Sequence, residues 1–310
     1  SMRLSRLVSL MLTAGCPTVG GQSVLEGVMM RNGDAYALAL RRPDGEIVAR
    51  RMPWFSLTRH PWLKKPFVRG FPVLIETLVN GIKALNRSAE HQAEGTEEEL
   101  KGWHLVLTLL LSLAMAVGLF VVVPHLLSLL MQWLELGGGV EGLTFHLWDG
   151  LFKCLIFMGY IWAISFVPDI RRVFQYHGAE HKCINCIEHG MELNVENVRK
   201  SSRQHKRCGT SFLLIVMLIS IVFFLFIRVD SRILQLVLRL LLIPVIAGVS
   251  YEFIRLAGRY DNRLVNILSK PGLWMQKMTT REPDDEMIEV GIASVEAVFD
   301  WRKWQKEENV

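Results

Sequence analysis

Four long apolar runs constrain the fold of this chain more than any other feature of its sequence. They cover residues 105–133, 147–167, 211–227 and 233–254, in a chain of 310 residues of which 51% are hydrophobic. A helix needs about 20 consecutive apolar residues to cross the hydrocarbon core of a bilayer. We therefore expect a mainly α-helical integral membrane protein with about four transmembrane helices, three or five being the nearest alternatives.

The first run is too long for one simple span. It contains Pro124, where we expect either a kink or the start of an interfacial helix. Only residues 228–232 separate the last two runs, so these two runs are expected to form a tight helical hairpin.

The distribution of basic residues predicts the orientation of the chain in the membrane. Residues 1–101 contain 14 Lys and Arg, residues 168–208 contain eight, and residues 134–146 contain none. Because basic loops stay on the cytoplasmic side, both termini and the 168–208 loop are expected in the cytoplasm. Residues 4–14 are short, amphipathic and without a clear cleavage site, so no cleavable signal peptide is expected.

This topology divides the chain into five segments. They are a cytoplasmic N-terminal region (1–101), a first transmembrane pair (102–167), a cytoplasmic loop rich in His and Glu (168–208), a second transmembrane hairpin (209–257) and a cytoplasmic C-terminal region (258–310).

The N-terminal region contains two kinds of predicted structure. Residues 17–53 read as a small β unit, with turn signals at Asn32-Gly33 and at Pro43-Asp44-Gly45. Residues 66–93 read as an amphipathic helix on or near the membrane surface, with apolar positions at Leu74, Leu78, Ile82 and Leu85. An acidic stretch at 94–100 then leads into the first span.

The motif with the clearest chemical meaning is His177-Gly178-Ala179-Glu180-His181. His-x-x-Glu-His is the reversed form of a zinc-peptidase pattern. On a helix the two histidines, four residues apart, share one face, and the glutamate between them can act as a general base. This spacing predicts a divalent metal site, with zinc as the expected ion.

A helix from a cap at Asp169 to a stop at Gly190 is expected to carry this motif. Six residues then fall on one stripe: Ile170, Phe174, His177, His181, Ile184 and Glu188. Imidazoles and carboxylates on an apolar face are costly unless they are paired or bind a cation. The alternative to a metal site is a network of His–Glu hydrogen bonds that anchors helices.

A second short helix is expected after it, from a cap at Asn194 to an end at Gly209. It would place His205 near the first two histidines, with Cys208 close by, so His205, Cys208 or Glu188 can complete the metal site. The basic run at 199–207 is expected to face anionic lipid headgroups. No nucleic-acid partner is expected, because the chain lacks an aromatic stacking platform.

The remaining candidate residues have weaker signals. Cys183 and Cys186 are interpreted as ordinary thiols, because no second Cys-x-x-Cys completes a zinc site. Glu252 emerges on the same side as the histidine loop, so it is either paired with Arg255 or close to the metal. We also expect Arg255 and Lys182 beside the site or along its cavity. The acidic residues around Pro283 describe a helix start.

Several long motifs resemble one family. Residues 20–31, 177–182, 205–212, 247–255 and 273–285 are similar to the YqhQ-like bacterial polytopic membrane proteins, a group described as predicted metal-dependent enzymes. The resemblance extends from about residue 18 to 298 and implies a multi-pass protein of the bacterial cytoplasmic membrane. Cys183, Cys186 and Lys206 depart from the pattern of that family.

These observations together predict metal-dependent hydrolysis at the cytoplasmic membrane surface. Glu180 would act as the base, and the substrate would be a membrane-associated peptide or a lipid-linked group. Reversed zinc-peptidase motifs normally belong to large soluble folds, so only the ligand spacing carries over. The alternative is a non-enzymatic scaffold, biogenesis factor or transporter component with a structural metal or polar site. Either protein can be an oligomer.

Overall fold

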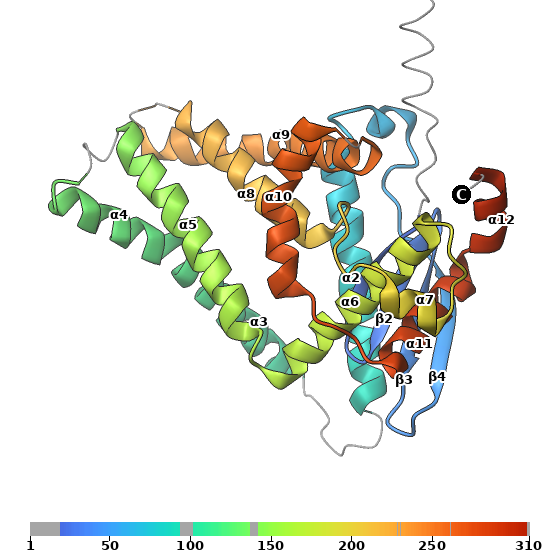
Figure 1. The fold of residues 1–310 in the computed structure, drawn as a ribbon. Coiled ribbons are helices and arrows are strands. Elements are labelled where there is room, and N and C mark those ends of the chain that lie inside the picture. The colour runs from blue at the N-terminus through green and yellow to red at the C-terminus, as the bar shows by residue number, and fades with distance from the viewer. Residues whose placement is uncertain are drawn as a thin grey trace, which may run out of the picture.

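The computed structural model describes residues 19–93, 102–136, 142–227, 229, 231–260 and 262–308. It is mainly helical, with a four-stranded antiparallel sheet at the N-terminus and three candidate membrane spans (Figure 1). The fold class predicted from the sequence is therefore confirmed. The predictions for residues 4–14 and 94–100 lie outside the described residues.

The predicted β unit is a simple meander. Strands β1 (Val19–Val24), β2 (Gly27–Asn32), β3 (Ala35–Arg41) and β4 (Ile47–Pro53) pair in sequence order, so β1 and β4 are the two edges. Both predicted turns are present, with Gly33 at φ 59° and Gly45 at φ 89°. Glycine adopts this left-handed backbone without a Cβ penalty, which explains its position at both turns.

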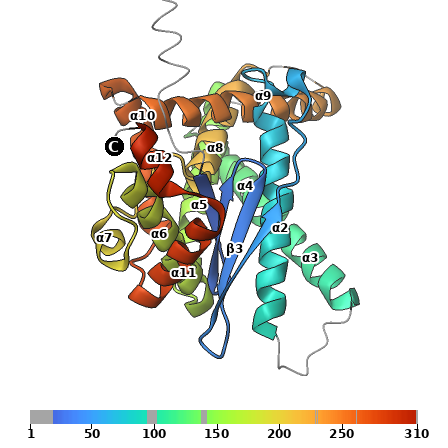
Figure 2. The ribbon, with the colours of Figure 1, turned by 90° about the vertical axis from the view of Figure 1, so that its right-hand side faces the viewer.

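Helices cover both faces of the sheet (Figure 2). Helix α2 (Gly70–Ala93) packs on one face, over a core that includes Leu38, Trp54 and Ala84. Helices α6 (Pro168–Glu188) and α11 (Asp285–Val298) pack on the other face. The core on this second side joins residues from β1, β2, β3, α6, α7 (Val195–Lys200), α11 and α12 (Trp301–Glu308).

A buried carboxylate fixes the segment between the sheet and α2. Glu76 is 0% exposed and accepts hydrogen bonds from the backbone amides of Leu57 (2.6 Å) and Thr58 (2.7 Å). It also accepts from three side chains, the Trp54 indole at 3.3 Å, the Ser56 hydroxyl at 3.1 Å and the Thr58 hydroxyl at 3.0 Å. Burial raises the pKa of Glu76, but these hydrogen bonds outweigh it and lower the pKa below its ordinary value.

Replacing Glu76 with alanine should therefore reduce the free energy of unfolding by about 3 kcal/mol, because five donors lose their acceptor. Glu90→Ala, on the exposed side of the same helix, should change it by less than about 0.5 kcal/mol. Denaturant unfolding of the purified protein measures both. Since the folded pKa is lowered, the difference should be complete at neutral pH and shrink as pH falls through that pKa. Equal losses in the two variants would contradict this role.

Three helices are long and apolar enough to cross a membrane: Leu110–Trp133, Leu143–Ile164 and Ile233–Arg259. The first combines α3 (Gly102–Val117), η2 (Gly118–Val122) and α4 (Val123–Trp133), and the others are α5 (Leu143–Ile164) and α9 (Arg232–Arg259). The third predicted run, 211–227, forms α8 (Gly209–Leu225), an apolar helix of 17 residues that is shorter than the three candidate spans. A π turn, η2, ends two residues before Pro124, and the proline lies in the first turn of α4. The kink or interfacial helix expected there stays a prediction.

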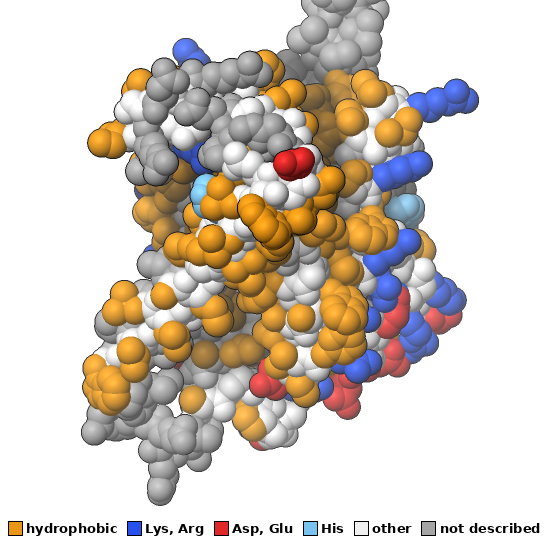
Figure 3. Space-filling model, turned by 90° about the vertical axis from the view of Figure 1, so that its left-hand side faces the viewer, with side chains coloured by type: hydrophobic (Ala, Val, Ile, Leu, Met, Phe, Trp, Pro, Cys, Tyr) orange, Lys and Arg blue, Asp and Glu red, His pale blue; other side chains and the backbone are white. Residues whose placement is uncertain are grey.

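The surfaces of these helices are apolar where a soluble protein would be polar. Leu126 and Leu130 of α4 are exposed, as are Leu151, Leu155 and Trp162 of α5. Figure 3 shows hydrophobic side chains spread across the middle of this face, with Lys, Arg, Asp and Glu gathered along one side. Exposed apolar side chains on helices long enough to cross a membrane are the surface that a bilayer would cover.

The remaining helices are η1 (Pro61–Lys64) and α10 (Arg263–Thr279). Two predicted boundaries are wrong. Asp169 lies in the first turn of α6 and does not cap it, since the helix already begins at Pro168. Helix α7 is capped by Asn194 as expected but ends at Lys200, so residues 201–208 form a loop and not the predicted helix up to Gly209. The predicted start of α11 is confirmed, with Asp284 as its cap.

Candidate metal centre

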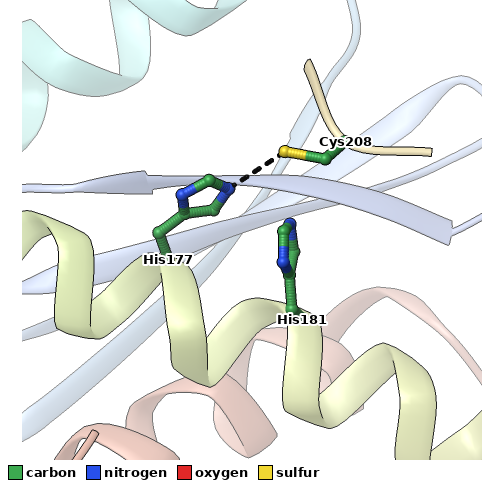
Figure 4. Close-up of side chains that lie close together, drawn as sticks. All are labelled: His177, His181 and Cys208. Atoms are coloured by element: carbon green, nitrogen blue, oxygen red, sulfur yellow. Dashed lines mark hydrogen bonds between the residues drawn. The ribbon is translucent and has the colours of Figure 1, made fainter. Parts of the chain in front are cut away.

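Helix α6 presents its two histidines on one side. His177 and His181 lie one turn apart, and their ring centroids are 4.3 Å from each other (Figure 4). Their exposed fractions are only 8% and 2%. The structure therefore places both imidazoles where the spacing of the motif predicts them, on one buried face.

Cys208 reaches the same place from a distant part of the sequence. It is the residue before α8, and its Sγ lies 3.3 Å from Nε2 of His177 (Figure 4). Each of the three side chains offers a ligand atom, and these atoms all lie within 4.8 Å of one another. Within the described part of the chain, His177, His181 and Cys208 thus form a buried group that can hold a metal ion.

Backbone carbonyls orient both rings for such a role. Nδ1 of His177 lies 2.8 Å from the carbonyl oxygen of Thr279, and Nδ1 of His181 lies 2.6 Å from that of Arg203. A carbonyl oxygen only accepts, so each Nδ1 carries a hydrogen, and each Nε2 offers a lone pair to a metal ion when its ring is neutral. Metal-binding histidines usually show this arrangement. Two such nitrogens and one sulfur are a donor set that zinc prefers.

The charges of these three side chains also shift one another's pKa values. Burial raises the pKa of the Cys208 thiol, but the charges of His177 and His181 outweigh burial and lower this pKa well below its usual value. Burial lowers the pKa of His177, yet the Cys208 sulfur prevails and raises it to about 9. A thiolate is the form of cysteine that binds metal, so the surroundings favour the ligand form of Cys208.

Glu180 lies beside the histidines on α6 and is 4% exposed. Burial is the main cause that raises the pKa of this carboxyl, while charge interactions with His181 and His177 oppose the rise. The backbone amide of Gly21 on β1 donates a hydrogen bond to it. A Cβ added to Gly21 would lie 2.9 Å from Cγ of Glu180, so this glycine allows the carboxylate to approach the strand.

The three candidate ligands and Glu180 open into a cleft of about 770 Å³. One side of the cleft is strand β1, from Val19 to Ser23. The other sides carry apolar residues of α2, α6, α8 and α9, namely Val73, Leu74, Val173, Phe174, Phe212, Leu213, Tyr251 and Ile254. Since α8 and α9 come from the apolar runs, the cleft joins the sheet to the membrane-spanning part of the molecule.

Two other predicted ligands lie outside the three-atom group. Nε2 of His205 lies 3.1 Å from a carboxylate oxygen of Glu188, and Arg207 contacts the second oxygen of the same carboxylate. Burial lowers the pKa of His205, and the Glu188 carboxylate opposes this shift. The ring centroid of His205 is 5.9 Å from that of His181, so His205 borders the cleft while its Nε2 is paired with Glu188.

Lys182 points away from the centre. Its Nζ donates to the carbonyl oxygens of Arg199 (2.8 Å) and Ser201 (2.9 Å) and lies 3.0 Å from a Glu282 carboxylate oxygen. It does not border the cleft where we expected it.

Glu252 has a different partner from the one expected. Its carboxylate binds Arg69 through two hydrogen bonds of 2.7 Å and also accepts from the Phe67 amide. The expected pairing with Arg255 is therefore replaced by an ion pair between α9 and the start of α2. Neither Glu252 nor Arg255 borders the cleft.

Four of the five basic residues at 199–207 form ion pairs within the chain, and the pairs of Arg199 and Lys200 are exposed. Arg199 pairs with Asp285, Lys200 with Glu196, Arg203 with Glu282 and Arg207 with Glu188. Contact of this run with lipid headgroups remains a prediction. Cys183 and Cys186 are free and buried, in agreement with their interpretation as packing thiols.

Sequence reasoning missed the groups that support the centre. The carbonyls of Thr279 and Arg203 and the amide of Gly21 are backbone atoms, which no side-chain motif identifies. The only signal was indirect, since Gly21 and Thr279 both lie in segments that resemble the family noted above.

The fold and the centre together define a membrane protein with a buried His/His/Cys group that can hold a metal ion. Residues 65–301 match the family described as "Protein of unknown function (DUF1385)", and the chain belongs to that family. It is 38% identical over 295 residues to "Uncharacterized protein YqhQ" of Bacillus subtilis (strain 168), covering 90% of this chain and 91% of the relative. The resemblance seen in the sequence is thereby confirmed. No solved structure matches the chain.

Proposed function

We propose that this protein is a zinc-dependent hydrolase that acts at the cytoplasmic surface of the bacterial membrane. The observation that carries the proposal is the buried group of His177, His181 and Cys208, with Glu180 beside it, bordering a largely apolar cleft. A purely structural site has no need of a cleft, whereas a catalytic site must admit a substrate.

The roles of the side chains follow from their positions. His177, His181 and Cys208 would hold the ion through two nitrogens and one sulfur. A zinc ion with three protein ligands has a fourth position for water or substrate, lowers the pKa of such water toward ~7 and polarises a carbonyl group. Glu180 would accept the proton of the attacking water, a task that suits a carboxyl whose pKa is raised by burial.

The substrate of this proposal is attached to the membrane. Most side chains that line the cleft are apolar, and some of them belong to α8 and α9. A membrane-associated peptide and a lipid-linked group both fit this description. The non-enzymatic alternative, a scaffold, biogenesis factor or transporter component, would use the same three residues as part of a closed structural site.

Elemental analysis of wild-type protein, purified without chelator, tests the proposal. We expect about one zinc ion per chain. X-ray absorption spectroscopy should then find three protein ligands and one oxygen from water. Protein that carries no transition metal, and takes none up, would overturn the proposal at its first step. A fourth protein ligand in place of water would favour the structural alternative.

The proposed location of the centre depends on the topology of the chain. Basic residues dominate 1–101 and 168–208, so reporter domains fused to either terminus should give cytoplasmic signals. A fusion within 137–141, between α4 and α5, should give a periplasmic signal and provides the matched control. A periplasmic signal from either terminus would contradict this orientation.

A further inference from the structure

Strand β1 is an edge strand of the sheet and at the same time a wall of the cleft. It pairs with β2 on one side only, and none of the described residues forms a backbone hydrogen bond to its other side. An unpaired edge presents a row of N–H and C=O groups that can pair with another extended chain.

The register shows which groups face outward. The hairpin between β1 and β2 has a two-residue loop, closed by the pair Val24 and Gly27. In such hairpins the closing pair is hydrogen-bonded, and bonded and non-bonded pairs then alternate. The backbone groups of Val19, Gly21 and Ser23 therefore point away from β2. The bond from the Gly21 amide to Glu180 on α6 agrees with this assignment and occupies that donor, which leaves the amides of Val19 and Ser23 and the three outward carbonyls for an added strand.

The outward groups lie along the same cleft as the candidate metal ligands. Val19, Gly21 and Ser23 border it together with His177 and Glu180. Nothing lies within 4 Å of the position that a Cβ of Gly20 would occupy, so the strand is uncrowded there. A polypeptide laid along β1 would therefore pass Glu180 and the histidines.

We propose that β1 binds an extended peptide as an additional strand, and that the substrate is an unwound segment of a membrane protein. This inference rests on the proposed function and selects the peptide over the lipid-linked group. A lipid chain has no backbone amides to pair with β1. Apolar side chains of the peptide, alternating along the strand, would contact residues such as Leu74, Phe212 and Ile254.

The reaction of this substrate is hydrolysis of a peptide bond. The oxygen of water forms a bond to the carbonyl carbon, and the bond from that carbon to nitrogen breaks. The proton that Glu180 accepts from water passes to the leaving amine. No oxidant or further reactant is required.

Binding of hydroxamates to the full-length, zinc-loaded protein in detergent tests the inference. The probes are acetyl-trileucine hydroxamate, its variants with one backbone nitrogen methylated, lauroyl hydroxamate and acetohydroxamate. We expect the tripeptide to bind at least tenfold more tightly than lauroyl hydroxamate. Methylation should cost about tenfold in affinity at alternate nitrogens and little at the others, because only alternate N–H groups of a strand point toward β1.

A pair of variants tests the strand itself. Ser23→Pro removes one outward N–H and no bond to β2, so it should weaken tripeptide binding about tenfold. Ser23→Ala keeps the N–H and should bind normally. Acetohydroxamate reports on the metal centre alone and should bind equally to both variants. If Ser23→Pro loses metal or acetohydroxamate binding, the substitution has disturbed the metal centre. Binding of the methylated peptides to wild-type protein then decides whether a peptide pairs with β1.

The outcomes separate the two proposals. Equal affinity for the tripeptide, all its methylated forms and lauroyl hydroxamate would overturn strand addition and leave the metal centre intact. Failure of every hydroxamate, including acetohydroxamate, to bind zinc-loaded protein would overturn the proposed function itself.

Discussion

Replacing both His177 and His181 with alanine should lower the zinc content of the purified protein from about one ion per chain to below about 0.1. Two of three candidate ligands disappear together, and the remaining Cys208 cannot hold the ion alone. Elemental analysis after removal of loosely bound metal measures the effect. Zinc that persists in the double variant would show that the ion binds elsewhere.

A control on the same helix separates loss of ligands from loss of fold. His189 follows α6, and its Nδ1 is 2.7 Å from the carbonyl oxygen of Asn185, away from the group of three. His189→Ala should keep its zinc. Circular dichroism of all variants should show the same helix content, since the altered side chains do not form backbone hydrogen bonds of α6.

The identity of the third ligand can be tested in the same assay. Cys208→Ser should weaken zinc binding at least tenfold, about 1.4 kcal/mol, because a neutral hydroxyl replaces a thiolate. His205→Ala should have little effect, since Nε2 of His205 already pairs with Glu188. The opposite ranking would mean that His205 turns toward the ion when it binds.

Local patterns in the sequence were sufficient where the interaction itself is local. The face shared by His177 and His181 follows from their spacing of four residues, and the turn at Asn32-Gly33 follows from its residue types. The membrane-spanning class follows from the length of the apolar runs, although α8, as long as its run of 17 residues, is shorter than the three candidate spans. These predictions required no knowledge of which segments meet in space.

Contacts between distant segments could not be read in the same way. Cys208, His205 and Glu188 were equivalent candidates, and the path of the loop 201–208 determines which one meets His177. A continuous helix over this loop was the wrong expectation. The sequence offers Glu252 either Arg255, by helical spacing, or the metal, yet its carboxylate binds Arg69, 183 residues away. The position of β1 at the edge of the described sheet likewise emerges only once the order of the strands is known.

Glu180→Gln should separate binding of the ion from catalysis. Glutamine keeps the size of the side chain and can still accept the hydrogen bond from Gly21, so the three candidate ligands stay in place. We therefore expect normal zinc content and normal acetohydroxamate binding. Hydrolysis should fall by about 10² to 10⁴, because an amide cannot accept the proton of the attacking water.

Two measurements follow this variant together. Elemental analysis reports the zinc, and complementation of a strain that lacks the gene reports the function. Glu192→Gln is a matched control outside the centre, because Glu192 lies beyond α6 and does not border the cleft. It should complement fully.

If Glu180→Gln also complements fully while it retains zinc, Glu180 is not a base and the ion is structural, which favours the scaffold over the enzyme. If Glu180→Gln loses its zinc, the Glu180 carboxylate itself contributes to metal binding, and Glu180 then belongs with the metal ligands.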